Sequence, residues 1–118
     1  MKMNYFVVGT NDMAAATGFY DALFQGLGLH RTTPSGRMTY WIGADFAFAV
    51  AIPYDGNPAS NGNGVMVGFG LGSVEEVKRL HSLAVALGGS DEGEPGQRGP
   101  RFSAYVRDLD GNKICLSD

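Results

Sequence analysis

The strongest constraint on the fold is an order of predicted elements that occurs twice along the 118-residue chain, at an offset of 61 residues. Each copy contains a strand, a helix and three short strands, with turn-forming residues between them. Matching the two helix starts, Asp12 and Ser73, also brings Tyr5 onto Met66. Self-similarity at a fixed period is typical of a duplicated supersecondary unit, so we expect an α+β chain built from two related modules.

The first module is expected at about residues 4–52. Asp12 is a predicted helix N-cap, because its carboxylate can accept from the first free amides of a helix. Apolar residues then recur at three- and four-residue steps as far as Leu27, which indicates a helix. Strands are predicted at residues 5–9, 29–32, 37–42 and 46–52.

The second module is expected at about residues 64–118, after a linker of turn formers at 53–63, and both modules belong to a single domain covering 1–118. Ser73 and Glu76 form a capping-box pattern that starts a helix over 73–87. Asp110-Gly111 lies between two apolar runs, which is typical of a hairpin. Strands are predicted at residues 65–69, near 90–92, and at 102–106 and 113–116.

The composition excludes several classes of function. Only 18% of residues are charged and the net charge is −3, so a nucleic-acid partner is not expected. The first residues lack the long apolar stretch of a secretory signal or a membrane span, so no membrane partner is expected. The single cysteine, Cys115, fits a reducing compartment, and we expect a cytoplasmic protein.

Few residues have the spacing of a catalytic or metal site. His30 and His81 come from unrelated elements and are predicted to be ordinary surface or edge residues. Cys115 lies in an apolar run, where a buried inert thiol is favoured over an activated nucleophile. Residues 93–101 are predicted as a flexible loop with a basic tip. Two interpretations of this loop stay open. In the first, the loop closes over a ligand and Arg98 or Arg101 binds its carboxylate or phosphate; in the second, the loop is simply solvated.

Four stretches together carry a resemblance to a known family. They are residues 5–13 followed by Phe19 and Tyr20, residues 63–69, residues 87–89 with Pro95 and Gly96, and residues 106–114 with their Asp-Leu-Asp-Gly-Asn turn. In this order and spacing the chain resembles the vicinal oxygen chelate superfamily, which includes glyoxalases, bleomycin-resistance proteins and dioxygenases. The resemblance implies paired βαβββ modules curled around a central cavity, commonly completed in a homodimer.

The resemblance also implies where a metal would bind in the metal-dependent members, through His or Glu side chains on the first and last strands of each module. Here those positions fall on Tyr5, on Met66, on Cys115 and near Ala47 or its neighbour Phe46. The four predicted strands contain no His, Asp or Glu, so shifting the register restores no ligand. We therefore expect no metal and no cofactor. The expected cavity is lined by Tyr5, Phe46, Ala47, Met66, Arg101, Phe102 and Cys115.

Three functional hypotheses follow from this sequence. The first is a metal-free protein that binds a small apolar or aromatic molecule, with Tyr5 orienting the ligand. The second is a glyoxalase-like lyase or isomerase that uses Tyr5 or Cys115 with Arg101 or Arg107. The third is a non-catalytic interaction module, so the sequence leaves open whether the protein is an enzyme.

Overall fold

The computed structural model describes residues 1–118, which form two units, Met1–Asn61 and Gly62–Asp118. The first unit contains β1 (Tyr5–Gly9), α1 (Met13–Leu23), β2 (His30–Ser35), β3 (Met38–Ile42) and β4 (Ala47–Ala51). Its four strands form one mixed sheet in the order β1-β4-β3-β2. β1 pairs in parallel with β4, and the other pairings are antiparallel.

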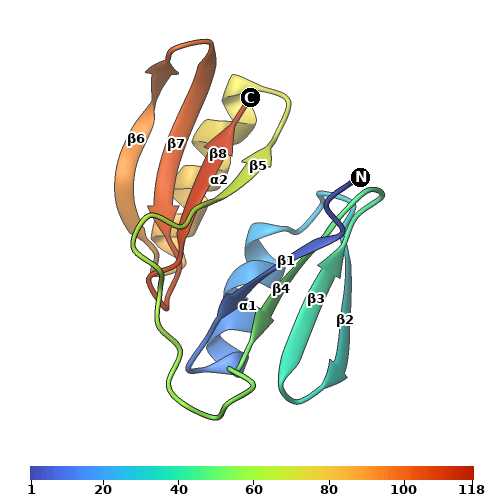
Figure 1. The fold of residues 1–118 in the computed structure, drawn as a ribbon. Coiled ribbons are helices and arrows are strands. Elements are labelled where there is room, and N and C mark those ends of the chain that lie inside the picture. The colour runs from blue at the N-terminus through green and yellow to red at the C-terminus, as the bar shows by residue number, and fades with distance from the viewer. The chain divides into compact units, whose positions relative to one another are not determined.

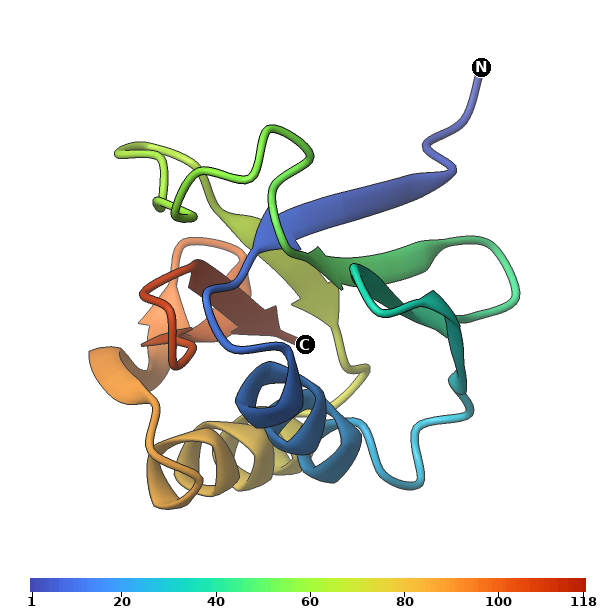
Figure 2. The same ribbon diagram turned by 90° about the horizontal axis from the view of Figure 1, so that it is seen from below.

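The second unit repeats this topology. It contains β5 (Val67–Gly70), α2 (Val74–Ala86), β6 (Ser90–Arg98), β7 (Arg101–Arg107) and β8 (Lys113–Ser117), and its sheet has the order β5-β8-β7-β6. In both units the helix covers one face of its own sheet (Figures 1 and 2). The predicted α+β fold with two βαβββ modules is therefore confirmed. Neither helix has the length and apolar run needed to cross a membrane.

One hydrogen bond occurs at the same place in both units and defines their internal alignment. The amide of Thr10 donates to the carbonyl of Ala51 at 2.9 Å, and the amide of Leu71 donates to the carbonyl of Ser117 at 2.7 Å. The two donors, Thr10 and Leu71, are 61 residues apart, as the predicted repeat requires, whereas the two acceptors, Ala51 and Ser117, are 66 residues apart. Five extra residues therefore lie between the helix and the last strand of the second unit.

Both helices begin where the sequence predicted. The Asp12 carboxylate accepts from the amide of Ala15 at 3.0 Å, and the Ser73 hydroxyl accepts from the amide of Glu76 at 3.2 Å. The Glu76 side chain does not complete the capping box. It makes two hydrogen bonds to Arg79 on the next turn of the helix.

The two units fill their cores differently. In the first unit, aromatic rings of α1 meet rings of the sheet: the centroid of Tyr20 lies 4.8 Å from that of Phe48 and 5.5 Å from that of Trp41. Each such pair adds about 0.5–1.5 kcal/mol to the burial of its surface. The second core is aliphatic, with fully buried side chains from α2, β7 and β8: Val77, Leu80, Ala84, Ala104, Val106, Ile114 and Leu116.

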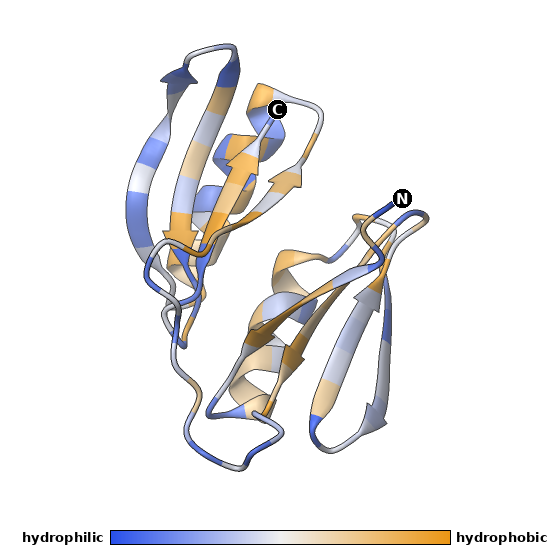
Figure 3. Cartoon of the chain, viewed as in Figure 1, coloured by the Kyte–Doolittle hydropathy of each residue, from blue (hydrophilic) through white to orange (hydrophobic).

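Because each helix covers only one face of its sheet, the other face, here called the helix-free face, is lined by the alternate residues of every strand. On β4, for example, Phe48 and Val50 point toward α1, so Ala47, Ala49 and Ala51 belong to the helix-free face. Figure 3 shows that β4 and β8 are largely hydrophobic, whereas β2 and β6, each at one of the two edges of its sheet, are largely hydrophilic. Polar edge strands discourage pairing with other chains.

Two sequence predictions are wrong in the second unit. The predicted flexible loop at 93–101 is mostly strand, because β6 continues to Arg98 and only Gly99 and Pro100 form the turn to β7. His81 is not a surface residue but is 8% exposed, with its Nε2 atom 3.0 Å from Oδ1 of Asp91. Two hydrogen bonds lower the pKa of the Asp91 carboxyl: the bond from the backbone amide of Gly93 has the larger effect, and the bond with His81 the smaller. His30 is exposed, as predicted.

The predicted hairpin between β7 and β8 is present, and Asp108 organises its turn. Its buried carboxylate accepts hydrogen bonds from the amides of Asp110 and Asn112, both at 2.9 Å, and from the side-chain amide of Asn112 at 3.0 Å. Three donors of the turn therefore depend on one side chain.

Replacing Asp108 by Ala should lower the free energy of unfolding by about 1–3 kcal/mol, because the hydrogen bonds from the backbone and side-chain amides of Asn112 to this buried carboxylate would be lost. Urea unfolding followed by circular dichroism measures this change. Asp45→Ala, in the turn between β3 and β4, is the matched control and should be nearly neutral. An equal loss in both variants would show that Asp108 has no special role in the hairpin.

Candidate functional site

The helix-free face of the first unit carries a pair of tyrosines. Tyr5 on β1 lies directly beside Ala47 on β4, and Tyr40 on β3 lies beside Ala49. The two rings meet edge to face across β4, with centroids 6.3 Å apart and an angle of 71° between the planes. The small alanine side chains between them allow this contact, and Tyr5 remains 57% exposed.

Most of this face is apolar. Its polar part lies at one edge, where Thr32 and His30 of β2 lie beside Tyr40 and Ile42. The guanidinium of Arg37 donates to the sulfur of Met38 at 3.2 Å. The strands β1, β3 and β4 contain no charged residue, and Val7 and Ile42 expose apolar side chains beside the two tyrosines. The hydroxyl of Tyr40 lies 3.6 Å from the sulfur of Met38, which accepts its hydrogen bond. The face therefore presents aromatic edges and apolar side chains to a ligand, with two phenol groups for polar contacts.

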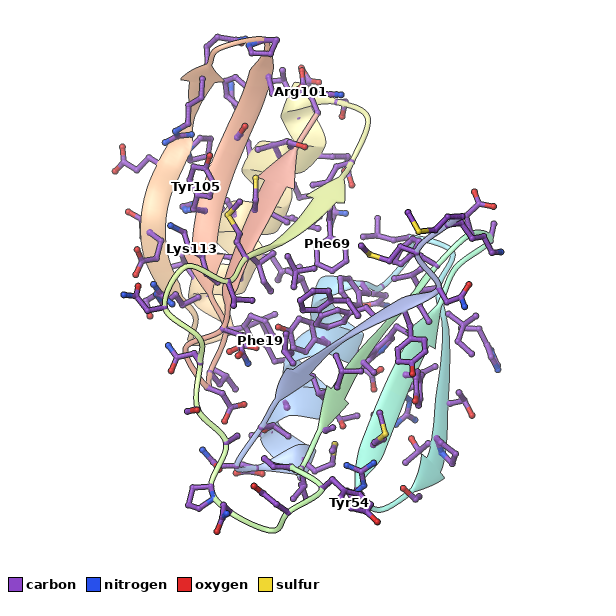
Figure 4. The ribbon with its side chains drawn as sticks, in the orientation of Figure 1. Phe19, Tyr54, Phe69, Arg101, Tyr105 and Lys113 are labelled. Atoms are coloured by element: carbon purple, nitrogen blue, oxygen red, sulfur yellow. The ribbon has the colours of Figure 1, made fainter.

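The helix-free face of the second unit is centred on Tyr105 and is cationic. The guanidinium carbon of Arg98 lies 5.0 Å from the centroid of the Tyr105 ring, and the ammonium nitrogen of Lys113 lies 5.2 Å from it. Figure 4 shows Tyr105 and Lys113 close together on this sheet. Both distances are those of cation–π interactions.

The backbone of β6 holds Arg98 against the ring. The guanidinium donates to the carbonyl of Ser103, and to that of Glu94 at 2.7 Å. Gly93 makes room for this arrangement, because a Cβ atom there would lie 2.7 Å from Cδ2 of Tyr105 and 3.2 Å from the guanidinium of Arg98. A glycine at this point of β6 therefore lets the ring lie directly on the backbone.

Cys115 lies beside Tyr105 on one side and beside Gly68 on the other. Burial raises the pKa of its thiol, and this effect outweighs the charge of Arg98, a hydrogen bond with Tyr105 and the charge of Lys113, all of which lower it. The thiol is therefore neutral at pH 7. Gly68 and Gly70 on β5 leave open space on this face, since a Cβ atom at either position would meet no atom within 4 Å.

The predicted cavity residues are divided between the two units. Tyr5 and Ala47 are neighbours, whereas Phe46 precedes β4 and lies against Gly43 in the preceding turn. Cys115 lies in the other unit, and Met66 there immediately precedes β5 and is 45% exposed.

Two further predicted residues lie away from Cys115. The ring of Phe102 faces α2, where the ammonium of Lys78 lies 5.7 Å from its centroid. Arg101 is exposed at the start of β7, four residues along the strand from Tyr105, which corresponds to about 13 Å.

Sequence reasoning missed Tyr40, Tyr105 and Lys113. A signal for Tyr105 was available, because pairing outward from the Asp-Gly hairpin places it opposite Cys115. Alternation along β8 then places Lys113 on the same face as Cys115. Nothing in the sequence indicated that Arg98 would reach back over the ring, because residues 93–101 have the composition of a loop.

The side chains at the family's metal positions do not fit a divalent cation. Tyr5 is paired with Ala47, and Cys115 is paired with Gly68, so each strand pair offers one phenol or one thiol and no imidazole or carboxylate. No three His, Cys, Asp or Glu side chains gather in an arrangement that could hold a metal ion.

Comparison with known proteins identifies the family. Residues 2–116 match the glyoxalase/bleomycin resistance protein/dioxygenase superfamily. The chain belongs to this superfamily. A glyoxalase/bleomycin resistance protein from Albidiferax ferrireducens T118 has a crystal structure that is 36% identical in sequence, with a TM-score of 0.90 over 97% of this chain and 95% of that one. No curated protein matches the chain.

More distant members of the superfamily share the fold. A family enzyme from Burkholderia phytofirmans PsJN is 16% identical, with a TM-score of 0.81 over 99% of this chain and 98% of that one. A lactoylglutathione lyase from Agrobacterium tumefaciens is 19% identical, with a TM-score of 0.71 over 97% and 90% of the two chains. At these identities the likeness concerns the fold alone.

Replacing Gly93 by Ala should displace the Tyr105 ring and lower the free energy of unfolding by about 1–3 kcal/mol, because the new methyl group would overlap the ring. Gly96→Ala is the matched control on the same strand, where the nearest atom to a new Cβ is 3.9 Å away. Urea unfolding and the ring resonances of Tyr105 measure the two effects. Equal stability of the two variants would contradict the close packing of Tyr105 on β6.

The neutral state of Cys115 predicts a pH dependence. Because burial raises the pKa of the thiol, the reactive thiolate should be scarcer than in a free thiol at the same pH, and reaction should accelerate only at higher pH. The rate of reaction of the folded protein with iodoacetamide between pH 6 and 10, compared with N-acetylcysteine, tests this. A Cys115 that reacts faster than the free thiol at pH 7 would mean that the cations outweigh burial.

Proposed function

We propose that the protein binds a small, largely apolar or aromatic molecule without a metal, and that the helix-free face around Tyr5 and Tyr40 is the binding surface. The observation that carries this proposal is the exposed, largely apolar aromatic surface of β1, β3 and β4, which includes two of the four strands that carry the family's metal positions. Exposed apolar side chains clustered on one face are typical of an interaction site.

The chemistry of the face supports an aromatic ligand in particular. Tyr5 and Tyr40 meet edge to face, so an aromatic ring of a ligand could stack on the face of one tyrosine or against the edge of the other. Each such contact contributes about 0.5–1.5 kcal/mol beyond the burial of surface. The exposed Tyr5 and the half-buried Tyr40 also carry hydroxyl groups that can hydrogen-bond a polar substituent. Members of the superfamily commonly work as homodimers, and we propose the same assembly for this chain.

The alternative of a lyase or isomerase that uses Cys115 has less support. The raised pKa of the thiol disfavours the thiolate that nucleophilic catalysis needs. Arg107 is also engaged, since its guanidinium donates to Glu92 at 2.6 Å and to the carbonyl of Gly111 at 2.7 Å. The name of the Agrobacterium tumefaciens relative describes a lyase, but its likeness to this chain is too distant to transfer that activity.

A titration with the neutral aromatic probe 2-naphthamide, followed by the amide resonances of the ¹⁵N-labelled protein, tests the binding proposal. Tyr5→Ala and Tyr40→Ala should each weaken binding by about two- to tenfold, because one ring contact is lost. Tyr54→Ala is the matched control, since Tyr54 is 91% exposed and lies in the segment after β4 (Figure 4). Its affinity should not change.

Metal analysis of the same samples completes the test. Binding of 2-naphthamide should be unchanged after dialysis against EDTA, and plasma mass spectrometry should find no stoichiometric divalent cation. Binding that requires an added cation would contradict the metal-free proposal. An equal loss of affinity in the Tyr54 variant, or no binding at all, would contradict the location or the ligand class.

A further inference from the structure

We propose that the helix-free face of β6, β7 and β8 is an anion-binding subsite, in which Lys113 and Arg98 receive the carboxylate of a small organic acid beside Tyr105. The inference goes beyond the binding of an apolar molecule. It rests on the proposed function in one respect only, namely that this chain binds small aromatic molecules.

The first support is that two cations contact the same ring and lack an anionic partner. Both lie about 5 Å from the centroid of the same ring, so their separation cannot exceed about one Debye length, ~10 Å at 0.1 M salt. No Asp or Glu oxygen lies within 4 Å of either charged group. A bound anion would relieve the repulsion between these like charges.

The second support is that hydrogen-bond donors remain available. The ammonium of Lys113 has three donors, and its contact within the protein is the ring of Tyr105. Arg98 uses two of its five N–H donors on the carbonyls of Ser103 and Glu94, which fix the guanidinium in place. One cation is therefore fixed by the backbone and the other has all its donors free for a ligand.

The third support is that the surface beside the cations is accessible. Tyr105, Lys113 and Cys115 are each partly exposed, and the neighbouring strand β5 presents Gly68 and Gly70 with open space above them. The body of a small molecule could occupy that space while its charged group contacts Lys113.

The surrounding charges favour a single negative charge on the ligand. Glu92 and Glu94 lie on β6, and the chain has a net charge of −3, so a doubly charged phosphate would meet more repulsion than a carboxylate. A planar carboxylate also matches the planar guanidinium of Arg98. We therefore assign the subsite to the carboxylate of a small organic acid.

The test compares 2-naphthoate with its neutral counterpart 2-naphthamide, by titration of the ¹⁵N-labelled full chain. The carboxylate should bind about tenfold more tightly than the amide and should shift the amide resonances of Gly68, Tyr105 and Cys115. Raising the salt concentration from 0.05 M to 0.5 M should reduce this preference, because screening weakens the contact.

Variants locate the charge that is responsible. Lys113→Gln should abolish the preference for 2-naphthoate, and Lys113→Arg should retain it. Lys78→Gln is the matched control, because it removes the same charge from beside an aromatic ring on the opposite face of the sheet, and it should leave the preference intact. Gly68→Val should weaken 2-naphthoate binding by filling the space beside Cys115, without loss of stability.

The outcomes separate this inference from the proposed function. Equal binding of the two probes, or an equal loss in the Lys78 variant, overturns the anion subsite, while binding of 2-naphthamide that depends on Tyr5 leaves the proposed function standing. Binding of 2-naphthoate through Lys113 with no binding of 2-naphthamide supports the subsite and counts against the proposed function. If neither 2-naphthoate nor 2-naphthamide binds, both the anion subsite and the proposed function are overturned.

Discussion

The parallel pairing of the first and last strand of each module determines the rest of the structure. β1 pairs in parallel with β4, and β5 pairs in parallel with β8. Parallel strands cannot be joined by a tight turn, so the chain must cross over the sheet after each first strand, and the helix forms that crossover. The helix then covers one face of the sheet and removes that face from solvent. Tyr5, Tyr40, Tyr105, Lys113 and Cys115 all lie on the other face, because the alternate residues of the same strands point toward the helix and form the core.

The two modules keep this architecture but have opposite surface chemistry. The helix-free face of the first unit is mostly apolar, with Tyr5 and Tyr40 in contact across small alanine side chains. The corresponding face of the second unit places two cations on Tyr105 and has glycines on its first strand. A duplicated scaffold has thus retained its strand pairing while both its core residues and its exposed residues diverged.

The sequence predicted the parts of the fold that depend on local interactions. The N-caps at Asp12 and Ser73 and the hairpin at 108–112 are confirmed, since each follows from residues close together in the chain. The repeat is confirmed as well, because the same order of local signals occurs in both modules. Only the start of β6, near 90–92, was predicted. Its extension to Arg98 was missed because its glycines and Pro95 resemble a loop, and its pairing with β7 is indeed irregular near Gly93. The cation pair on Tyr105 was missed for a related reason: Arg98, Tyr105 and Lys113 meet only through the register of three strands.

The aromatic core of the first unit also makes the protein a natural reporter of its own unfolding. Trp41 is the only tryptophan in the chain, is 2% exposed and donates to Asp21 at 3.0 Å. Its fluorescence therefore senses the loosening of one module, while the aliphatic core around Leu80 and Ile114 gives no tryptophan signal. Comparing that emission with the far-ultraviolet signal of both sheets would distinguish modules that melt together from modules that melt one after the other.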